Sequence, residues 1–240
     1  MSGYFGKYEF AGIPCAVCCG ERYIERQCEG YETDRDPWQY FFIGKDAVAA
    51  ERAMADSDGY SRGYLESLAF YRRFCTAASR ENVILFHSSA VAVDGRAYLF
   101  AAPSGTGKST HARLWRELLG DRAVMINDDK PLIRVENGRI TVYGTPWTGK
   151  HRLGANISAE AAGIVFLERS ETNYITPLTP GAALPLMAAQ TFRPAGTENL
   201  LSVMGAVSKM AQALPTYRLG CNISEEAARL SFRTLTGKDI

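Results

Sequence analysis

Apolar and polar positions divide the chain into two parts with different patterns. In residues 4–45, short apolar pieces such as Tyr40–Ile43 indicate strands, and Gly, Asp and Pro residues interrupt them. Residues 61–78 instead have the spacing of an amphipathic helix, and its predicted buried face carries Leu65, Leu68, Ala69, Cys75 and Ala78. We therefore expect a small β-rich accessory lobe at 1–60 and a larger domain at 61–240.

Strands and helices alternate in the larger domain. The segment "VILFHSSAVAV", the pair Asp94-Gly95 and the segment "RAYLFA" predict a hairpin, because Gly tolerates the positive φ of a type I′ turn. After this hairpin we expect a helix that ends at Gly120, then a strand "RAVMIN". A second hairpin around Asn137-Gly138 and a strand "GIVFLE" should come next. Further helices are expected in three places: near 180–190, at about 198–213 and from Ser224. The pattern predicts the mixed α/β class, with mixed β-sheets flanked by helices.

Composition is that of a soluble globular protein. Apolar residues make up 46% and charged residues 22% of the 240 residues. Lys and Arg total 27 against 26 for Asp and Glu, so there is no global basic field and no nucleic-acid partner is expected. No apolar run is long enough to span a bilayer, and the first residues lack the apolar stretch of a secretion signal. We expect a cytoplasmic protein with no membrane partner, whose six Cys are reduced.

Four of the six Cys lie close together in the first 28 residues. Cys15 and Cys18 have the C-x-x-C spacing of metal and redox sites, and Cys19 and Cys28 are near them. No second C-x-x-C follows at zinc-site spacing, and no His is nearby. The pattern therefore favours a β-hairpin with small buried Cys side chains, and a zinc site remains the alternative.

The segment Ala102–Thr110, "APSGTGKST", differs from the phosphate-loop pattern only in having Ala102 at the first Gly position. A predicted strand precedes it and a predicted helix follows. Such a loop works because successive backbone N–H groups surround phosphates at the N-terminus of a helix. We predict that this loop binds ATP with Mg²⁺ and that the Ser109 hydroxyl is a metal ligand. The residues expected to hold the nucleotide are Ser104, Gly105, Thr106, Gly107, Lys108, Ser109 and Thr110.

A second string, "GTPWTGKH" at 144–151, only partly matches the same pattern. His151 supplies no hydroxyl for Mg²⁺, and Pro146 removes an N–H. We therefore do not expect a second nucleotide loop. Lys150 or Arg152 could instead bring positive charge to the substrate or to the transition state. The alternative is an ordinary exposed turn that carries cations.

Asp128 and Asp129 follow an apolar strand, twenty residues after Lys108. A carboxylate at a strand end beside a phosphate loop is typical of a Mg²⁺ site. We predict that Asp129 binds the metal and that Asp128 is the base for a hydroxyl nucleophile; a plain turn is the alternative. His87 could orient the catalytic carboxylate or be a buried structural residue, and His111 is expected to be exposed or packed.

These motifs together resemble a known family. "FHSSAV", "DGRAYLFAAPSGTGKST" and "AVMINDD" are similar to the catalytic domain of HPr kinase/phosphorylase, especially to short HPr-kinase-like proteins found beside bacterial peptide-modification genes. The resemblance covers about residues 64–170 well and the remainder more loosely. It implies the P-loop fold shared with phosphoenolpyruvate carboxykinases, and it implies ATP-dependent phosphorylation of a Ser hydroxyl. In the family the first Asp of the pair is the base and the His lies near it, which corresponds here to Asp128 and His87.

The function expected from the residues and the resemblance is that of a Mg²⁺–ATP kinase. Its acceptor would be a hydroxyl of a peptide, a protein or a small metabolite, because the Arg-rich signature that recognises HPr is missing after Gly144. The chain could also act as a homo-oligomer. Two alternatives remain: a nucleotide-binding regulator without transfer activity, and an enzyme like phosphoenolpyruvate carboxykinase. The second would need further metal ligands, and the chain has only three His.

Overall fold

The computed structural model describes residues 3–240. Its N-terminal part contains a three-stranded sheet, in which β2 (Ile13–Cys19) lies between β1 (Tyr4–Phe10) and β3 (Gln39–Phe42). β1 is antiparallel to β2, and β3 is parallel to it. Three helices accompany this sheet: α1 (Tyr23–Gln27), α2 (Lys45–Met54) and α3 (Arg62–Ala78). The strand near Tyr40 and the helix over 61–78 are as predicted, whereas α1 and α2 were not expected from the sequence.

The core of the N-terminal part is aromatic. Phe10 of β1 contacts Phe70 and Phe74 of α3, with ring centroids 6.0 Å and 5.3 Å apart. The cysteines belong to the same core, because Cys15 and Cys28 are completely buried. Burial raises the pKa of both thiols, and no cluster of three or more His, Cys, Asp or Glu side chains suited to a metal occurs in residues 3–240. Cys15, Cys18 and Cys19 thus lie on β2 of the β1–β2 hairpin, whereas Cys28 follows α1.

The remaining strands form one nine-stranded sheet. Its main path runs in the order β4-β8-β9-β10-β6-β5-β7, and β12 and β11 extend it from β10. The strands are β4 (Val83–Leu85), β5 (Ser89–Val93), β6 (Arg96–Ala101), β7 (Ala123–Asn127), β8 (Leu132–Glu136), β9 (Arg139–Tyr143), β10 (Ser158–Arg169), β11 (Tyr174–Pro177) and β12 (Thr216–Cys221). Both predicted hairpins are present, and left-handed residues make their turns: Asp94 and Gly95 in one, Asn137 and Gly138 in the other.

β10 is the strand at which the sheet branches. Its first residues, 158–160, pair with β9, and its last residues, 164–169, pair with β12. β6 pairs in parallel with residues 160–166. The strand is therefore longer than the predicted segment "GIVFLE", because it links two groups of strands.

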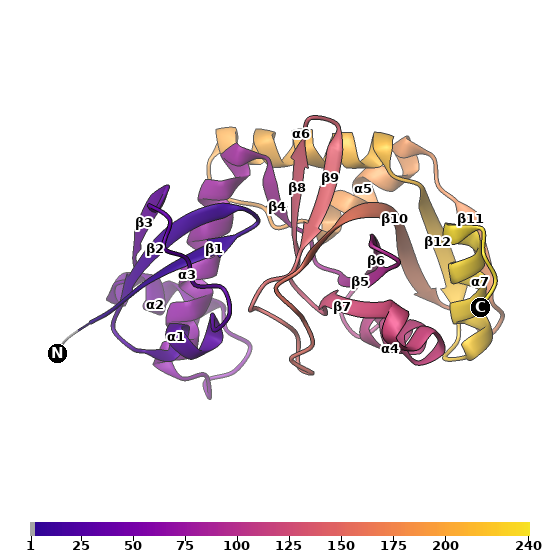
Figure 1. The fold of residues 1–240 in the computed structure, drawn as a ribbon. Coiled ribbons are helices and arrows are strands. Elements are labelled where there is room, and N and C mark those ends of the chain that lie inside the picture. The colour runs from indigo at the N-terminus through magenta and orange to yellow at the C-terminus, as the bar shows by residue number, and fades with distance from the viewer. Residues whose placement is uncertain (1–2) are drawn as a thin grey trace.

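Helices cover both faces of this sheet (Figure 1). Along β6, Ala97, Leu99 and Ala101 face α5 (Pro180–Gln190) and α6 (Thr197–Ala213), and Tyr98 and Phe100 face the opposite layer. That layer contains α4 (Lys108–Leu119) and α7 (Glu225–Thr236). The alternation follows from the two-residue period of a strand. The mixed α/β class with flanking helices, expected from the sequence, is confirmed.

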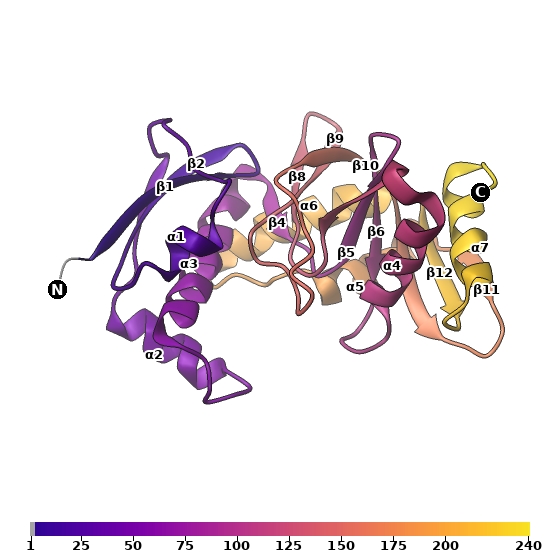
Figure 2. The same cartoon turned by 60° about the horizontal axis from the view of Figure 1, so that its bottom comes forward.

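The segment between β9 and β10 belongs to the larger part of the molecule and packs against the N-terminal part. It extends from the nine-stranded sheet into the space between α3 and α4 (Figures 1 and 2). Trp147 of this segment lies in the N-terminal core and stacks on Tyr71 of α3, with centroids 4.0 Å apart and planes 8° apart. Because α3 also belongs to that core, residues 61–78 pack with the preceding lobe, and the division at residue 60 remains a proposal.

Candidate active site

The phosphate-loop segment lies between β6 and α4, as its pattern requires. Gly105 and Gly107 have φ of 78° and 124°, which favour Gly, and a Cβ at either position would meet no atom within 4 Å. Gly107 is the N-cap of α4, and no side chain caps the helix. The first N–H groups of a helix have no intrahelical acceptor, and α4 has no acidic residue in its first turn. The loop is therefore open to an anion.

Lys108 lies inside this loop. Its Nζ donates a hydrogen bond to the Ala102 carbonyl oxygen at 2.9 Å, and the residue is only 8% exposed. Burial lowers the pKa of Lys108, while the charges of Asp129 and Asp128 oppose that shift. Ala102 is 1% exposed, so its methyl group fits the core at the position where the motif has Gly.

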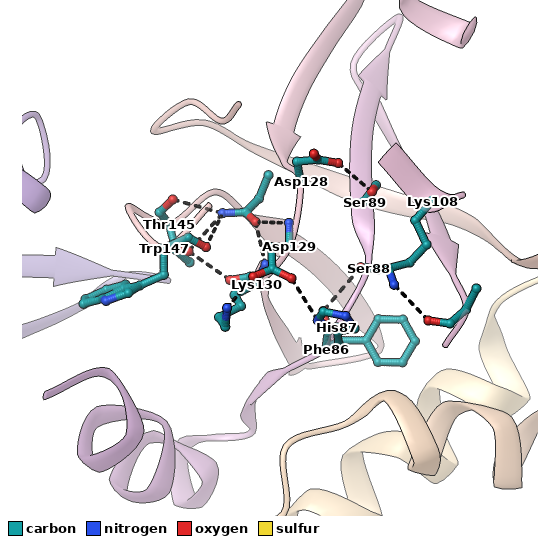
Figure 3. A network of polar contacts seen from close by, with 12 residues as sticks. Phe86, His87, Ser88, Ser89, Lys108, Asp128, Asp129, Lys130, Thr145 and Trp147 are labelled. Atoms are coloured by element: carbon teal, nitrogen blue, oxygen red, sulfur yellow. Dashed lines mark hydrogen bonds and ion pairs between the residues drawn. The ribbon is translucent and has the colours of Figure 1, made fainter. Parts of the chain in front are cut away.

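The chain turns sharply at the end of β7, and Asn127 holds the turn. The Asn127 Oδ1 accepts hydrogen bonds from the backbone N–H groups of Asp129 and Lys130, at 2.8 and 2.7 Å. Its Nδ2 donates to the carbonyl oxygen and to the hydroxyl of Thr145, both at 3.0 Å. This turn directs the two neighbouring carboxylates to different partners, as Figure 3 shows.

Asp128 is the buried member of the pair, at 4% exposure. Its Oδ1 accepts a hydrogen bond from the Ser89 hydroxyl at 2.7 Å. Its Oδ2 is also buried, and no group within residues 3–240 donates to it. An unpaired buried carboxylate oxygen is costly unless a cation or donor reaches it.

Asp129 is the more accessible member of the pair. Its Oδ1 lies 3.1 Å from the His87 Nδ1, and its Oδ2 contacts the Lys130 ammonium. Burial alone would raise the pKa of Asp129, but the hydrogen bond from His87 and the charge of Lys130 outweigh it and lower the pKa to about 2. Asp129 is therefore ionised at neutral pH.

The Gly144–Gly154 segment packs closely against the end of β7. A Cβ on Gly144 would lie 1.8 Å from the Ala155 carbonyl oxygen, so only Gly fits there. A Cβ on Gly149 would lie 3.3 Å from the Asp129 Cβ. Lys150 and Arg152 follow as exposed residues, and Arg152 has a left-handed φ of 51°. The segment is not a second phosphate loop, because the helix that such a loop needs does not follow it.

A cleft of about 1230 Å³ lies beside these groups. Ser104, Asp129, Lys150 and Arg152 line it, together with residues of the N-terminal part. The structure thus brings four of the residues selected from the sequence to one cavity. Asp128 and residues 105–110 do not line that cavity, and His87 contacts it only through Asp129.

His111 is packed, one of the two outcomes expected for it. It is 3% exposed, and its Nε2 lies 2.9 Å from the Ser231 hydroxyl of α7. Burial lowers the pKa of His111 to about 4. It therefore links α4 to α7 and takes no part in the site.

Sequence reasoning missed several residues that shape the site. Ser89 and Lys130 contact the two carboxylates, and Asn127 accepts from the backbone N–H of Asp129. The Arg169 Nη2 at the end of β10 donates to the Gly105 carbonyl oxygen at 2.7 Å. Asn127 and Lys130 flank the Asp pair and could have been noticed for that reason. Nothing in the sequence brings Arg169, which lies 64 residues from Gly105, next to the phosphate loop.

The donor set suits Mg²⁺ with a nucleotide. Mg²⁺ prefers oxygen ligands and usually takes only one or two carboxylates in addition to phosphates and water. The Ser109 hydroxyl and the unpaired Oδ2 of Asp128 are oxygen donors of this kind. The open amides of the loop fit the phosphates.

Comparisons with known proteins add little to this geometry. No protein-family model and no curated protein matches the chain. Among solved structures, the HPr(Ser) kinase/phosphatase from Coxiella burnetii is similar, with 10% sequence identity, a TM-score of 0.35, and an alignment over 64% of this chain and 99% of that chain. A likeness at this TM-score is too weak to carry a conclusion. In residues 3–240, every helix is too short or too polar to cross a bilayer.

Proposed function

We propose that this protein is a Mg²⁺–ATP-dependent kinase that phosphorylates a hydroxyl group. The observation that carries the proposal is that the phosphate loop and Asp129 meet at one cleft. The buried ammonium group of Lys108 lies inside the loop, at the start of α4. Asp129 in turn lines the same cleft as Ser104 of the phosphate loop. A phosphate donor and an acceptor could therefore meet between Ser104 and Asp129.

The loop from Ser104 to Thr110 would hold the nucleotide. Its open backbone N–H groups suit the β- and γ-phosphates, and Lys108 would exchange its bond to the Ala102 carbonyl for a phosphate oxygen. Bound Mg²⁺ would neutralise charge on the phosphates, and Ser109 supplies one of its oxygen ligands.

For the two carboxylates we propose the opposite division of roles to the one expected from the sequence. Asp129 lines the cleft, so it is the better placed to accept a hydrogen bond from the acceptor hydroxyl. Asp128 is buried, with one oxygen held by Ser89 and the other unpaired, which suits a metal ligand. His87 would orient Asp129 through their 3.1 Å contact.

In the proposed transfer step, one bond to the γ-phosphorus forms and one breaks. The acceptor oxygen forms a bond to the γ-phosphorus while the bond from that phosphorus to the β–γ bridging oxygen breaks, and ADP leaves. The hydroxyl proton passes to Asp129. Lys150 and Arg152, which line the cleft, would stabilise charge on the transferring group.

Four proteins test this proposal: wild type, Lys108→Ala, Asp128→Asn and Asp129→Asn. Calorimetric titration with ATP and MgCl₂ measures binding, and radiolabelled ATP measures transfer to a panel of hydroxyl peptides and small alcohols. We expect Lys108→Ala to lose nucleotide affinity at least about tenfold. Asp129→Asn should bind ATP like wild type and lose transfer by about 10²–10⁴-fold. Asp128→Asn should lose the Mg²⁺ dependence of binding.

Two results would contradict parts of the proposal. Normal transfer by Asp129→Asn, with loss of transfer by Asp128→Asn at unchanged Mg²⁺-dependent affinity, would restore Asp128 as the base. Tight ATP binding by the wild type without transfer to any acceptor would instead identify a nucleotide-binding regulator.

A further inference from the structure

The cleft has more room than a small acceptor needs. Its volume of about 1230 Å³ exceeds the roughly 300–1,000 Å³ typical of small-molecule pockets. Of the phosphate-loop residues 104–110, only Ser104 lines it. Most of the cleft is therefore lined by residues outside the loop, which leaves room for an acceptor beside Ser104.

One wall of the cleft comes from the N-terminal part and is rich in tyrosine. Tyr23 of α1, Tyr64 of α3, and Tyr60, which lies just before α3, all line it. Their rings are in contact, with Tyr64 6.1 Å from Tyr23 and 5.0 Å from Tyr60 between centroids. All three are half-buried, so they present flat apolar surface with polar edges to whatever occupies the cleft.

Three of the positively charged side chains that line the cleft form no ion pair within residues 3–240. Arg26, Lys150 and Arg152 line it, and none of them has a carboxylate within 4.0 Å in residues 3–240. Lys130, by contrast, is paired with Asp129. Arg26 comes from α1, and the other two cations come from the segment before β10, so positive charge flanks the space from two sides.

We infer that the N-terminal wall recognises an acidic polypeptide segment and presents its hydroxyl residue to Asp129. This rests on the proposed kinase function of the same site. Arg26 pairs with an acidic side chain next to the hydroxyl residue, and Tyr23, Tyr60 and Tyr64 pack along the segment. Acceptor recognition is then the role of the N-terminal part, because the phosphate-binding residues all lie outside it.

A polypeptide fits better than the other anionic polymers. Glu29 and Asp56 also line the cleft, and the Tyr60 hydroxyl donates to Asp56 at 2.7 Å. These carboxylates would repel the continuous charge of a nucleic-acid backbone, whereas a peptide can place its charges selectively. The volume of the cleft, about 1230 Å³, is also more than a small alcohol would fill.

Peptide binding without nucleotide tests the inference separately from transfer. Fluorescence anisotropy would compare labelled peptides that carry one Ser flanked by Glu and Asp, by Lys, or by Gly and Ala, with wild type and with Arg26→Ala and Arg26→Glu. Arg22→Ala is the matched control, because Arg22 stands just before the same helix, is 76% exposed in its side chain, and pairs with Glu25 outside the cleft.

We expect the wild type to bind the acidic peptide at least tenfold more tightly than the others, with affinity that falls as salt rises. Arg26→Ala should weaken that binding about tenfold and Arg26→Glu more, while Arg22→Ala and ATP affinity stay unchanged. Equal binding of all three peptides, equally tight binding of single-stranded nucleic acid, or equal effects of Arg22→Ala and Arg26→Ala would overturn the inference.

Different results would contradict the peptide-recognition inference and the kinase proposal. Transfer to small alcohols without peptide binding would overturn this inference and leave the kinase standing. Selective, Arg26-dependent binding of the acidic peptide without any transfer would support the recognition wall and contradict the kinase.

Discussion

At the scale of single residues, Asp129 is the group whose charge the fold controls most clearly. His87 and Lys130 contact its two oxygens, and its pKa is lowered from the ordinary 3.8 to about 2. A carboxyl group whose pKa is lower in the folded state stabilises the fold above its ordinary pKa, and that contribution is lost as pH falls through the folded value.

This linkage predicts a pH-dependent effect of Asp129→Asn. Near pH 7 the variant should be less stable than wild type by up to about 2 kcal/mol, since one pKa unit corresponds to about 1.4 kcal/mol. The difference should shrink as pH falls below about 4 and vanish near about 2. Urea unfolding at several pH values measures it. A difference that does not change with pH would show that the ion pairs of Asp129 contribute nothing to folding.

Arg169 gives a second prediction at this scale. Its guanidinium holds the Gly105 carbonyl oxygen, so it fixes the loop conformation that nucleotide binding needs. Arg169→Ala should weaken ATP binding by roughly three- to tenfold, because a hydrogen bond from a charged group contributes about 1 kcal/mol or more. Arg218→Ala is the control, since Arg218 lies on neighbouring β12 and pairs with Glu168. Calorimetric titration that finds the two variants alike would contradict the role of Arg169.

Which residues of the site could be predicted depends on how far their partners lie along the chain. Lys108 and the Asp pair were found because a local motif places them at a strand end and a helix start. Ser89, which holds Asp128, is 39 residues away from it, and its partner is set by the pairing of β5 with β7. The division of roles within the Asp pair also depends on Asn127, whose turn sends the two carboxylates in different directions.

At the scale of elements, α4 is held in place by a polar contact inside an apolar core. The Ser231 hydroxyl of α7 accepts a hydrogen bond from the Trp115 Nε1 at 2.9 Å and donates to the Ala228 carbonyl oxygen at 2.9 Å. Because its single proton is used there, it also accepts from the His111 Nε2. His111 is therefore neutral with its proton on Nε2.

Removing this hydroxyl should loosen α4 from α7. Ser231→Ala leaves two buried donors without an acceptor, so we expect a loss of about 1–3 kcal/mol in the free energy of unfolding. Thr234→Ala on the same helix is the control, because the Thr234 hydroxyl bonds only to the Leu230 carbonyl within the helix. Thermal unfolding compares the two. Equal stability of both variants would contradict the structural role of Ser231.

Elements with strong local signals were predictable, and short or polar ones were not. The turns at Asp94-Gly95 and Asn137-Gly138 adopt the left-handed conformations that their residues favour. The helix after Ser224 begins there, because the Ser224 hydroxyl accepts from the Ala227 N–H. α1 has five residues, and α2 buries only Ala47 and Glu51, so neither has an apolar face long enough to be recognised.

At the scale of the whole molecule, the site depends on contacts that no local pattern contains. Trp147 of the segment before β10 is buried in the N-terminal core and stacks on Tyr71, whose hydroxyl donates to the Lys130 carbonyl oxygen at 2.8 Å. The N-terminal part is thus tied to the turn that carries Asp129. The sequence marked that part only as an accessory lobe, because the tyrosines and Arg26 that line the cleft form no motif by themselves.

The central claim is that a nucleotide bound at residues 104–109 presents its terminal phosphate to the cleft beside Asp129. A crystal structure with Mg²⁺ and a non-hydrolysable ATP analogue tests it most directly. We predict the β- and γ-phosphates against the backbone N–H groups of that loop, with Lys108 moved from the Ala102 carbonyl to a phosphate oxygen. A nucleotide bound elsewhere, or a γ-phosphate directed away from Asp129, would contradict the account.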